Sequence, residues 1–259
     1  MNPTPLGQHF LINQNIASKM ILNLFPAQGP ILEIGPGRGI LSELLIRHRG
    51  NNKLILVEKD RSLAEEIQQK FRENCLIINA DILDIELDKL PVRERLNLIG
   101  NIPYYISKEL IDWIIRQSRF IRMGILMMQR EFVVKIIRIS NSKANNARSL
   151  MFRTLFQSKK ICDVNPGSFS PPPDVISTVF NFQPRPGQDK ILSQGEFYQF
   201  LQQAFRSRRK TLFNNLSGVY GKDKLNATFC SGKIKNNLRA EQLGLPDFLK
   251  LYSELTHNR

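Results

Sequence analysis

The chain of 259 residues carries 37 Lys and Arg against 23 Asp and Glu, a formal net charge of +14. No apolar run reaches the ~18 residues of a membrane span, and the first residues lack a signal-peptide pattern, so we expect a soluble, cytoplasmic protein without a membrane partner. The three cysteines are isolated and the three histidines have no metal-ligand spacing, which argues against disulfides and against a metal site.

The positive charge is concentrated in two segments. Residues 1–115 carry 13 basic and 14 acidic side chains, whereas residues 116–160 carry 11 basic and one acidic, and residues 206–239 carry nine basic and one acidic. One such segment is often only a solvated surface, but two of them beside a neutral half favour a polyanionic partner. Nucleic acid fits better than a membrane, because neither terminus shows a strongly amphipathic basic helix.

The first predicted elements are an amphipathic helix within the first thirty residues and a buried strand at residues 30–34. This strand runs into the glycine turn Gly35-Pro36-Gly37-Arg38-Gly39, and a helical pattern follows. Strand, glycine turn and helix allow the backbone to approach a nucleotide-like ligand closely. The spacing G-x-G-x-G is not the G-x-G-x-x-G of a dinucleotide site, which disfavours a dehydrogenase.

A second strand, residues 53–57, ends on Glu58, which is placed to accept hydrogen bonds from both ribose hydroxyls. Together with the glycine turn, Glu58 predicts a nucleoside-type cofactor. A third strand, residues 76–79, leads to Asp81. Asp81 would accept the adenine amino group of such a cofactor, or it would only cap a helix or turn.

A fourth strand, residues 96–100, delivers Asn101-Ile102-Pro103-Tyr104. The amino group of adenine is a poor nucleophile because its lone pair is delocalised into the ring, so it needs acceptors for both hydrogens. The Asn101 oxygen supplies one, and a backbone carbonyl turned outward by Pro103 supplies the other. Tyr104 offers a flat face for the base. Taken alone, these residues also fit a strand end followed by a packed aromatic.

A helix capped by Ser107, a fifth strand at residues 122–128 and a basic amphipathic helix at residues 131–139 follow. The alternation of strands and helices predicts a parallel α/β sheet with its ligands at the carboxyl ends of the strands.

Two further strands, residues 155–164 and 177–182, flank the loop Phe169-Ser170-Pro171-Pro172-Pro173. This rigid loop would hold Phe169 over the opposite face of a base, or would be only a Pro-rich connector with a packed Phe. A Pro/Gly linker at residues 183–189 then precedes helical patterns. We therefore expect two domains, residues 1–187 and 188–259, with the second entirely helical.

Several motifs together resemble the ribosomal RNA adenine dimethylases in order and spacing. They are Gly7-Gln8-His9-Phe10-Leu11, Glu33-Ile34-Gly35-Pro36-Gly37, Glu58, Asp81, Gly100-Asn101-Ile102-Pro103-Tyr104, Gln129-Arg130-Glu131, Phe169-Ser170-Pro171-Pro172-Pro173 and Arg208-Arg209-Lys210-Thr211-Leu212. The resemblance spans nearly the whole chain. It is most specific at the Asn-Ile-Pro-Tyr and Arg-Arg-Lys-Thr-Leu segments.

The resemblance implies a Rossmann-like α/β methyltransferase domain with a small helical RNA-binding domain. Such an enzyme transfers methyl groups from S-adenosylmethionine (AdoMet) to N6 of two adjacent adenines in a hairpin of small-subunit rRNA, with no metal. The implied cofactor contacts are His9, Leu11, Gly35, Gly37, Glu58, Asp81 and Asn101. The implied catalytic residues are Asn101, Tyr104 and Phe169. The expected RNA contacts are Arg130, Arg148, Arg208, Arg209 and Lys210. We expect a monomer.

The chain departs from the family's usual residues at four places. The family usually has Asn at the positions of His9 and Tyr105, Lys and Asp at those of Asp174 and Ile176, and an aromatic-Gly-Arg loop where Asn145-Asn146-Ala147-Arg148 stands. These departures leave open the cofactor affinity, the number of methyl groups added and the precise RNA site.

Two other functions stay open from the sequence. One is methylation of a large-subunit rRNA adenine, against which the Arg208 to Leu212 segment argues. The other is a ribosome assembly factor with weak or no catalysis, against which the intact Asn101, Tyr104, Glu58 and Asp81 argue.

Overall fold

The computed structural model describes residues 8–137, 145–187 and 194–256. The chain divides into two compact units, Met1–Val133 with Phe156–Pro184, and Val134–Leu155 with Arg185–Arg259. The second unit therefore includes Val134–Leu155, a segment that the sequence interpretation assigned to the first domain. Gly7 and the end of the helix expected at residues 131–139 lie outside the described residues.

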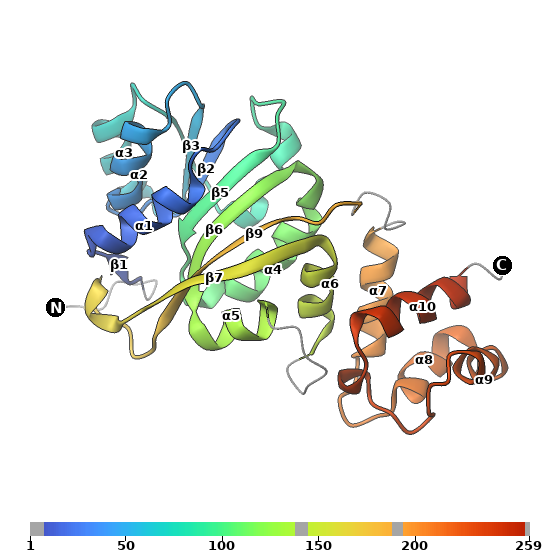
Figure 1. The fold of residues 1–259 in the computed structure, drawn as a ribbon. Coiled ribbons are helices and arrows are strands. Elements are labelled where there is room, and N and C mark those ends of the chain that lie inside the picture. The colour runs from blue at the N-terminus through green and yellow to red at the C-terminus, as the bar shows by residue number, and fades with distance from the viewer. Residues whose placement is uncertain (1–7, 138–144, 188–193, 257–259) are drawn as a thin grey trace. The chain divides into compact units, whose positions relative to one another are not determined.

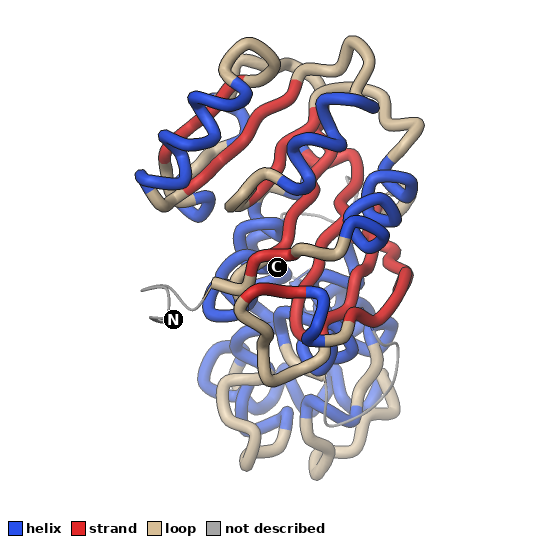
Figure 2. The backbone as a smooth tube through the Cα atoms, turned by 90° about the vertical axis from the view of Figure 1, so that its left-hand side faces the viewer, coloured by secondary structure: helices blue, strands red, loops and turns tan. Residues whose placement is uncertain are grey.

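Within the described residues of the first unit, seven strands form one sheet in the order β4-β3-β2-β5-β6-β9-β7. Strands β4 to β6 pair in parallel, as predicted, whereas β9 is antiparallel to both β6 and β7. Helices lie on both faces of this sheet (Figures 1 and 2). The strands are β2 (Ile31–Ile34), β3 (Leu54–Glu58), β4 (Leu76–Asn79), β5 (Leu96–Asn101), β6 (Ile121–Gln129), β7 (Phe156–Val164) and β9 (Ser177–Pro184).

A second, two-stranded sheet joins the start of the described chain to the Pro-rich loop. Strand β1 (Phe10–Leu11) pairs antiparallel with β8 (Phe169–Ser170). Figure 1 shows the blue β1 next to the yellow segment that contains β8. Residues far apart in the sequence are thereby brought together at one end of the sheet.

The helices of the first unit follow the predicted apolar spacing. They are α1 (Gln14–Leu24), α2 (Ile40–His48), α3 (Arg61–Phe71), α4 (Ser107–Arg116) and α5 (Arg130–Ile137), the last of which extends into the second unit. The Asn13 and Asp60 side chains cap α1 and α3 by accepting backbone N–H groups. The prediction for Ser107 was wrong, because Ile106 occupies the N-cap position and Ser107 is already helical.

The helices of the second unit pack around an aromatic core. They are α6 (Ala147–Leu155), α7 (Gln194–Ala204), α8 (Leu212–Tyr220), α9 (Lys222–Ser231) and α10 (Leu245–Thr256). Phe197 and Phe200 of α7 contact Tyr252 of α10 at ring-centroid distances of 5.1 and 5.4 Å. The Thr211 side chain caps α8. Beyond the linker, the described residues are helical and contain no strand, as predicted.

Short 3-10 helices connect these elements. They are η1 (Ile82–Asp84), η2 (Leu87–Lys89), η3 (Tyr104–Ile106), η4 (Ser118–Phe120), η5 (Pro166–Ser168) and η7 (Ala240–Gln242). None of the helices in the described ranges has the length and apolar character that crossing a membrane requires.

Gly100 makes the close contact between β5 and β2 possible. A Cβ atom built on Gly100 would lie 2.6 Å from the Ile34 carbonyl oxygen, a backbone atom that cannot rotate away. We predict that Gly100→Ala lowers the free energy of unfolding by ~1–3 kcal/mol in urea denaturation. Gly167→Ala is the control, because its Cβ would meet no atom within 4 Å. Equal stabilities of the two variants would contradict this packing.

Candidate functional site

The carboxyl ends of β2, β3 and β5 meet at one cavity in the first unit. Because β2 lies between β3 and β5, this is the point where the strand order changes direction, the usual ligand site of an α/β sheet. The cavity holds about 690 Å³ of empty space, its open mouth included. It is lined by Gln8, His9, Phe10, Leu11, Glu33, Gly35, Pro36, Gly37, Arg38, Ile40, Leu41, Glu58, Asn101, Ile102, Pro103 and Tyr104.

The glycine turn forms one wall of the cavity. Gly35 and Gly37 have φ angles of +62° and +55°, which side chains rarely tolerate. A Cβ on Gly35 would meet no atom within 4 Å, so the space beside this glycine is open, whereas one on Gly37 would lie 3.0 Å from the Phe10 ring. The turn therefore leaves room for a ligand against the backbone, as the sequence predicted.

Glu58 lies at the end of β3 and is 4 % exposed. Its Oε2 accepts the Gly37 N–H at 3.0 Å and its Oε1 accepts the Asp60 N–H at 3.0 Å. Burial raises the pKa of Glu58, and the two backbone donors oppose this effect. Each carboxylate oxygen keeps further acceptor capacity, so Glu58 is able to fix the glycine turn and still bind hydroxyl groups.

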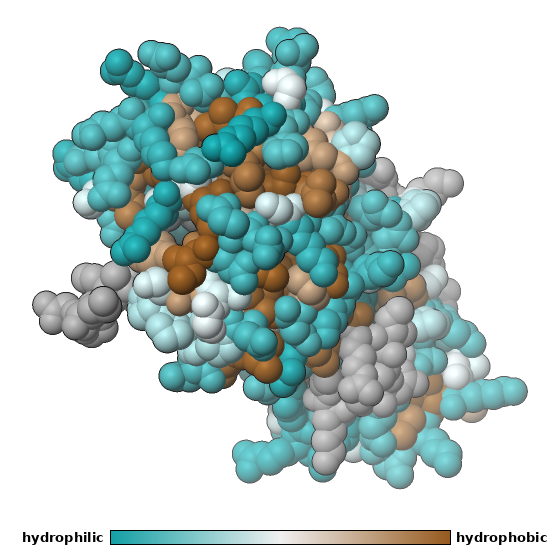
Figure 3. All heavy atoms as spheres, turned by 60° about the vertical axis from the view of Figure 1, so that its left-hand side comes forward, coloured by the Kyte–Doolittle hydropathy of each residue, from teal (hydrophilic) through white to brown (hydrophobic). Residues whose placement is uncertain are grey.

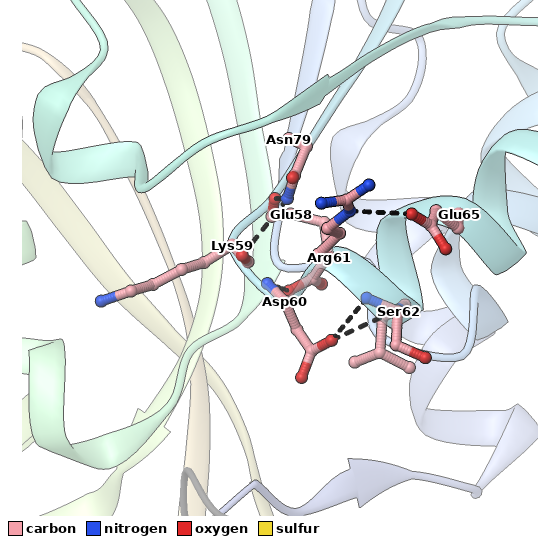
Figure 4. Close-up of polar contacts among 8 residues, drawn as sticks. Glu58, Lys59, Asp60, Arg61, Ser62, Glu65 and Asn79 are labelled. Atoms are coloured by element: carbon pink, nitrogen blue, oxygen red, sulfur yellow. Dashed lines mark hydrogen bonds and ion pairs between the residues drawn. The ribbon is translucent and has the colours of Figure 1, made fainter.

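The residues after Glu58 are held by hydrogen bonds to α3 and to Asn79. Asp60 points to the first turn of α3 and accepts the backbone N–H groups of Ser62 and Leu63, while the Lys59 side chain extends in another direction (Figure 4). Asn79 donates from its amide to the carbonyls of Glu58 and Lys59. These contacts rigidify the end of β3, which positions the Glu58 carboxylate.

Glu33 is a buried acid of the cavity to which the sequence interpretation gave no separate role. It is 1 % exposed, lines the cavity and accepts a hydrogen bond from the Ser42 hydroxyl at 2.7 Å. Burial raises the pKa of Glu33 to about 8. The hydrogen bond from Ser42 lowers this pKa, and the nearby Glu58 charge raises it by a smaller amount. Its position inside a strand, among apolar residues, was the signal that could have identified it.

Asp81 does not line the cavity, although it follows β4 on the same edge of the sheet. Its Oδ1 accepts the Leu83 N–H at 3.0 Å and thereby caps η1, and its Oδ2 pairs with Lys59 at 2.9 Å. In this structure Asp81 therefore acts as a cap, as in the second of the two roles given above. Binding of an adenine amino group by Asp81 remains a prediction.

Asn101 is held in one orientation at the end of β5. Its Nδ2 donates to the His9 carbonyl at 2.9 Å. Because the nitrogen of the amide is engaged there, the oxygen is the atom of Asn101 left to accept a hydrogen bond at the cavity. The predicted role of Asn101 in holding an amino group uses this oxygen and remains a prediction.

Tyr104 lies beside Asn101 in η3 and is partly buried. Its hydroxyl is 2.7 Å from Ser177 Oγ, and its ring centroid is 5.6 Å from that of His9 at an angle of 36°. Burial raises the pKa of Tyr104, whereas the hydrogen bond with Ser177 lowers it. The sequence predicted the ring at the site but missed Ser177, which no motif argument had singled out.

Residues 8–11 form another wall of the cavity. His9 Nδ1 is 2.8 Å from the Pro171 carbonyl, and the Arg38 guanidinium lies 4.6 Å from the centre of the Phe10 ring. Leu11 is 5 % exposed and belongs to the core. In Figure 3, apolar surface is visible in patches between polar side chains, and one patch lies beside the start of the described chain.

Phe169 does not have the position that stacking on a base requires. Its side chain is 3 % exposed, belongs to the hydrophobic core and does not line the cavity. Pairing of β8 with β1 directs the Phe169 side chain inward. The alternative given above, a Pro-rich connector with a packed Phe, is therefore the one that this structure shows. The loop contacts the site through the Pro171 carbonyl instead, which lies 2.8 Å from His9 Nδ1.

The basic residues expected to contact RNA are divided between the two units. Arg130 begins α5 in the first unit and is exposed. In the second unit, Arg148 is partly buried on α6, while Arg208, Arg209 and Lys210 are exposed before α8.

Asn145, where the family usually has an aromatic-Gly-Arg loop, is 1 % exposed. It accepts a hydrogen bond from Arg153 at 2.7 Å and donates to the Leu243 carbonyl at 3.3 Å. Asn145 thus holds α6 to the segment before α10.

The pKa of Glu33 predicts a pH dependence of stability. Because the folded-state pKa of about 8 lies above the ordinary value of 4.5, the folded state binds this proton more tightly. The stabilisation that protonated Glu33 gives to the folded state is complete below pH 4.5 and is lost as the pH rises toward 8. We predict that, between pH 6 and 8, the wild type loses ~1–3 kcal/mol of unfolding free energy relative to Glu33→Gln in urea denaturation.

The matched control for Glu33→Gln is Glu65→Gln, because Glu65 is exposed on α3 and pairs only with Arg61 among the interactions described. Its stability should follow that of the wild type at every pH. A constant difference between the wild type and Glu33→Gln across this range would contradict the raised pKa.

Comparisons with known proteins identify the family of this chain. The model of the ribosomal RNA adenine dimethylase family matches residues 2–257. The chain is 34 % identical to ribosomal RNA small subunit methyltransferase A of Mycoplasmopsis pulmonis, over 96 % of this chain and 97 % of that one. It is 31 % identical to the protein of the same name from Synechococcus elongatus, over 96 % and 93 % of the two chains.

Solved structures show the same fold. A dimethyladenosine transferase from Plasmodium falciparum is 23 % identical, with a TM-score of 0.77 over 96 % of this chain and 98 % of that one. The 23S rRNA methyltransferase ErmE is 22 % identical, with a TM-score of 0.67 over 95 % and 99 % of the two chains. The family model and the curated relatives cover nearly the whole chain, and the protein therefore belongs to the ribosomal RNA adenine dimethylase family.

Proposed function

We propose that this protein is an AdoMet-dependent enzyme that dimethylates N6 of two adjacent adenines in a hairpin of small-subunit rRNA during ribosome biogenesis. Membership of the family and the names of the curated relatives support the reaction and the small-subunit substrate. The observation that carries the proposal is the fixed orientation of Asn101, with its Nδ2 on the His9 carbonyl, beside Tyr104 at the mouth of the cavity.

The residues of the cavity fit AdoMet. Open space beside Gly35 would admit the ligand against the backbone, and the Glu58 carboxylate would accept hydrogen bonds from the ribose hydroxyls. His9 and Leu11 would form another wall. Asp81, at the end of the neighbouring strand, would take the adenine amino group. When bound, AdoMet supplies a methyl group on a positively charged sulfur, which leaves as a neutral thioether.

The target base would be held by Asn101 and Tyr104. Asn101 Oδ1 would accept one hydrogen of the N6 amino group, and the Ile102 carbonyl, before Pro103, would accept the other. With both hydrogens bound, the N6 lone pair points at the methyl group rather than into the ring. Tyr104 would stack on the base. The N6 nitrogen forms the new bond to carbon, and its surplus proton passes to water.

The RNA would be bound electrostatically by basic residues, of which all but the partly buried Arg148 are exposed. Arg130 in the first unit, and Arg148, Arg208, Arg209 and Lys210 in the second, would contact phosphates. We assign catalysis to residues 1–187 and additional RNA binding to residues 188–259, in a protein that acts as a monomer.

The Asn101→Ala variant tests the proposed chemistry. We predict a fall in methyl transfer to purified, unmethylated small subunits of ~10²-fold or more, because one acceptor for the amino group is lost. Binding to the subunits, measured by co-sedimentation, should remain. Asn51→Ala is the matched control, because Asn51 is an exposed asparagine in the turn before β3. Unchanged methyl transfer by Asn101→Ala would exclude Asn101 as the acceptor for the amino group. Absence of methyl transfer by the wild type, with subunit binding intact, would instead favour a binding role in ribosome assembly.

The basic segment before α8 gives a second test. Replacing Arg208, Arg209 and Lys210 together by Ala should weaken small-subunit binding and reduce the slope of log affinity against log salt by ~2–3. AdoMet binding should not change. The control is the pair Arg47→Ala and Arg72→Ala, which removes exposed charge from the first unit. An unaltered salt slope would exclude these residues as phosphate contacts.

A further inference from the structure

Ser177 is a buried hydroxyl that no motif of the sequence singled out. It is the first residue of β9, is 0 % exposed, and pairs with Gln129 of β6 and Val164 of β7. The surrounding strands fix its backbone on both sides. A hydroxyl in such a position has little freedom to move, which makes it a firm anchor for whatever it contacts.

The side-chain contact of Ser177 is with the proposed platform for the base. Ser177 Oγ and the Tyr104 hydroxyl are 2.7 Å apart. A tyrosine held only by its ring contacts is able to tilt and shift, whereas a hydrogen bond at the far end of the ring limits both movements. The rigid β9 strand thereby fixes the plane of the Tyr104 ring at the cavity.

The segment from Pro171 to Ser177 is also held to the site at its Pro171 end. The Pro171 carbonyl is 2.8 Å from His9 Nδ1, and His9 in turn accepts the Asn101 amide through its backbone carbonyl at 2.9 Å. Asn101 and Tyr104 are thus tied, directly or through His9, to the two ends of the same loop. The distance between the amino-group acceptor and the stacking ring depends on these contacts.

We propose that Ser177 is a positioning residue of the methyl transfer: its hydroxyl holds the Tyr104 ring so that the stacked adenine presents N6 at Asn101. The proposal rests on the proposed function of Asn101 and Tyr104. Displacement of a reacting group by about 1 Å is enough to slow a reaction strongly. Ser177 therefore influences the rate of the chemical step without touching the base, and cofactor binding at Gly35 and Glu58 is independent of it.

A double-mutant cycle tests this role, with Ser177→Ala, Tyr104→Phe and the double variant. We expect each single variant to lower kcat for unmethylated small subunits by ~10-fold, with little change in KM for RNA or in AdoMet affinity. The double variant should be no slower than either single variant, because both changes break the same hydrogen bond. A full rate in Ser177→Ala, or multiplied losses in the double variant, would overturn the proposal.

Thr178→Val controls for the loss of a buried hydroxyl. Thr178 follows Ser177 on β9, is also 0 % exposed and donates to Asp163 at 2.6 Å, away from Tyr104. We expect this variant to keep its kcat even where its melting temperature falls as far as that of Ser177→Ala. An equal loss of kcat in Thr178→Val would reduce Ser177 to a general role in stability and overturn the proposal.

Tyr104→Ala separates this proposal from the proposed function. Loss of methyl transfer in Tyr104→Ala together with a full rate in Ser177→Ala would refute the positioning role and leave the stacking role of Tyr104 standing. Full activity of Tyr104→Ala would refute the stacking role itself, and with it the role of Ser177.

Discussion

The hydrogen bond from Asn101 Nδ2 to the His9 carbonyl spans 92 residues of sequence and is the contact on which the proposed site depends. It turns a flexible amide into an oriented acceptor, and it holds the wall formed by residues 8–11 against the end of β5. The β1–β8 pairing and the contact from His9 to Pro171 support the same wall from the other side. The cofactor cavity and the proposed base platform therefore share one set of contacts.

Two buried carboxyl groups give the cavity its electrostatic character. Glu58 accepts backbone N–H groups from the glycine turn and from Asp60, so it stabilises the loop that a ligand must approach. Glu33 is more deeply buried and its pKa is raised to about 8, so it holds its proton over much of the neutral range in the free protein.

The sequence predicted the parallel sheet and the edge at which its site lies, because both follow from apolar periodicity and from glycines and acids at strand ends. It did not predict that Phe169 is buried, that Asn145 is internal or that Ser177 contacts Tyr104. The first and third depend on which strands pair, here β1 with β8 and β9 with β6, and the second depends on the contact of Asn145 with the segment before α10. A single sequence carries no local signal for such contacts between distant segments. Local hydrogen bonding likewise decided the position of Asp81, whose carboxylate caps η1 and pairs with a neighbouring lysine.

The central claim is that this geometry transfers methyl groups to adenine N6 in small-subunit rRNA. The most direct measurement is to incubate the protein with labelled AdoMet and unmethylated small ribosomal subunits, digest the RNA and analyse the adenosines by mass. We predict N6-dimethyladenosine at two neighbouring positions of the small-subunit RNA. Binding to the subunits without any methylated adenosine, or methylation confined to large-subunit RNA, would contradict the account.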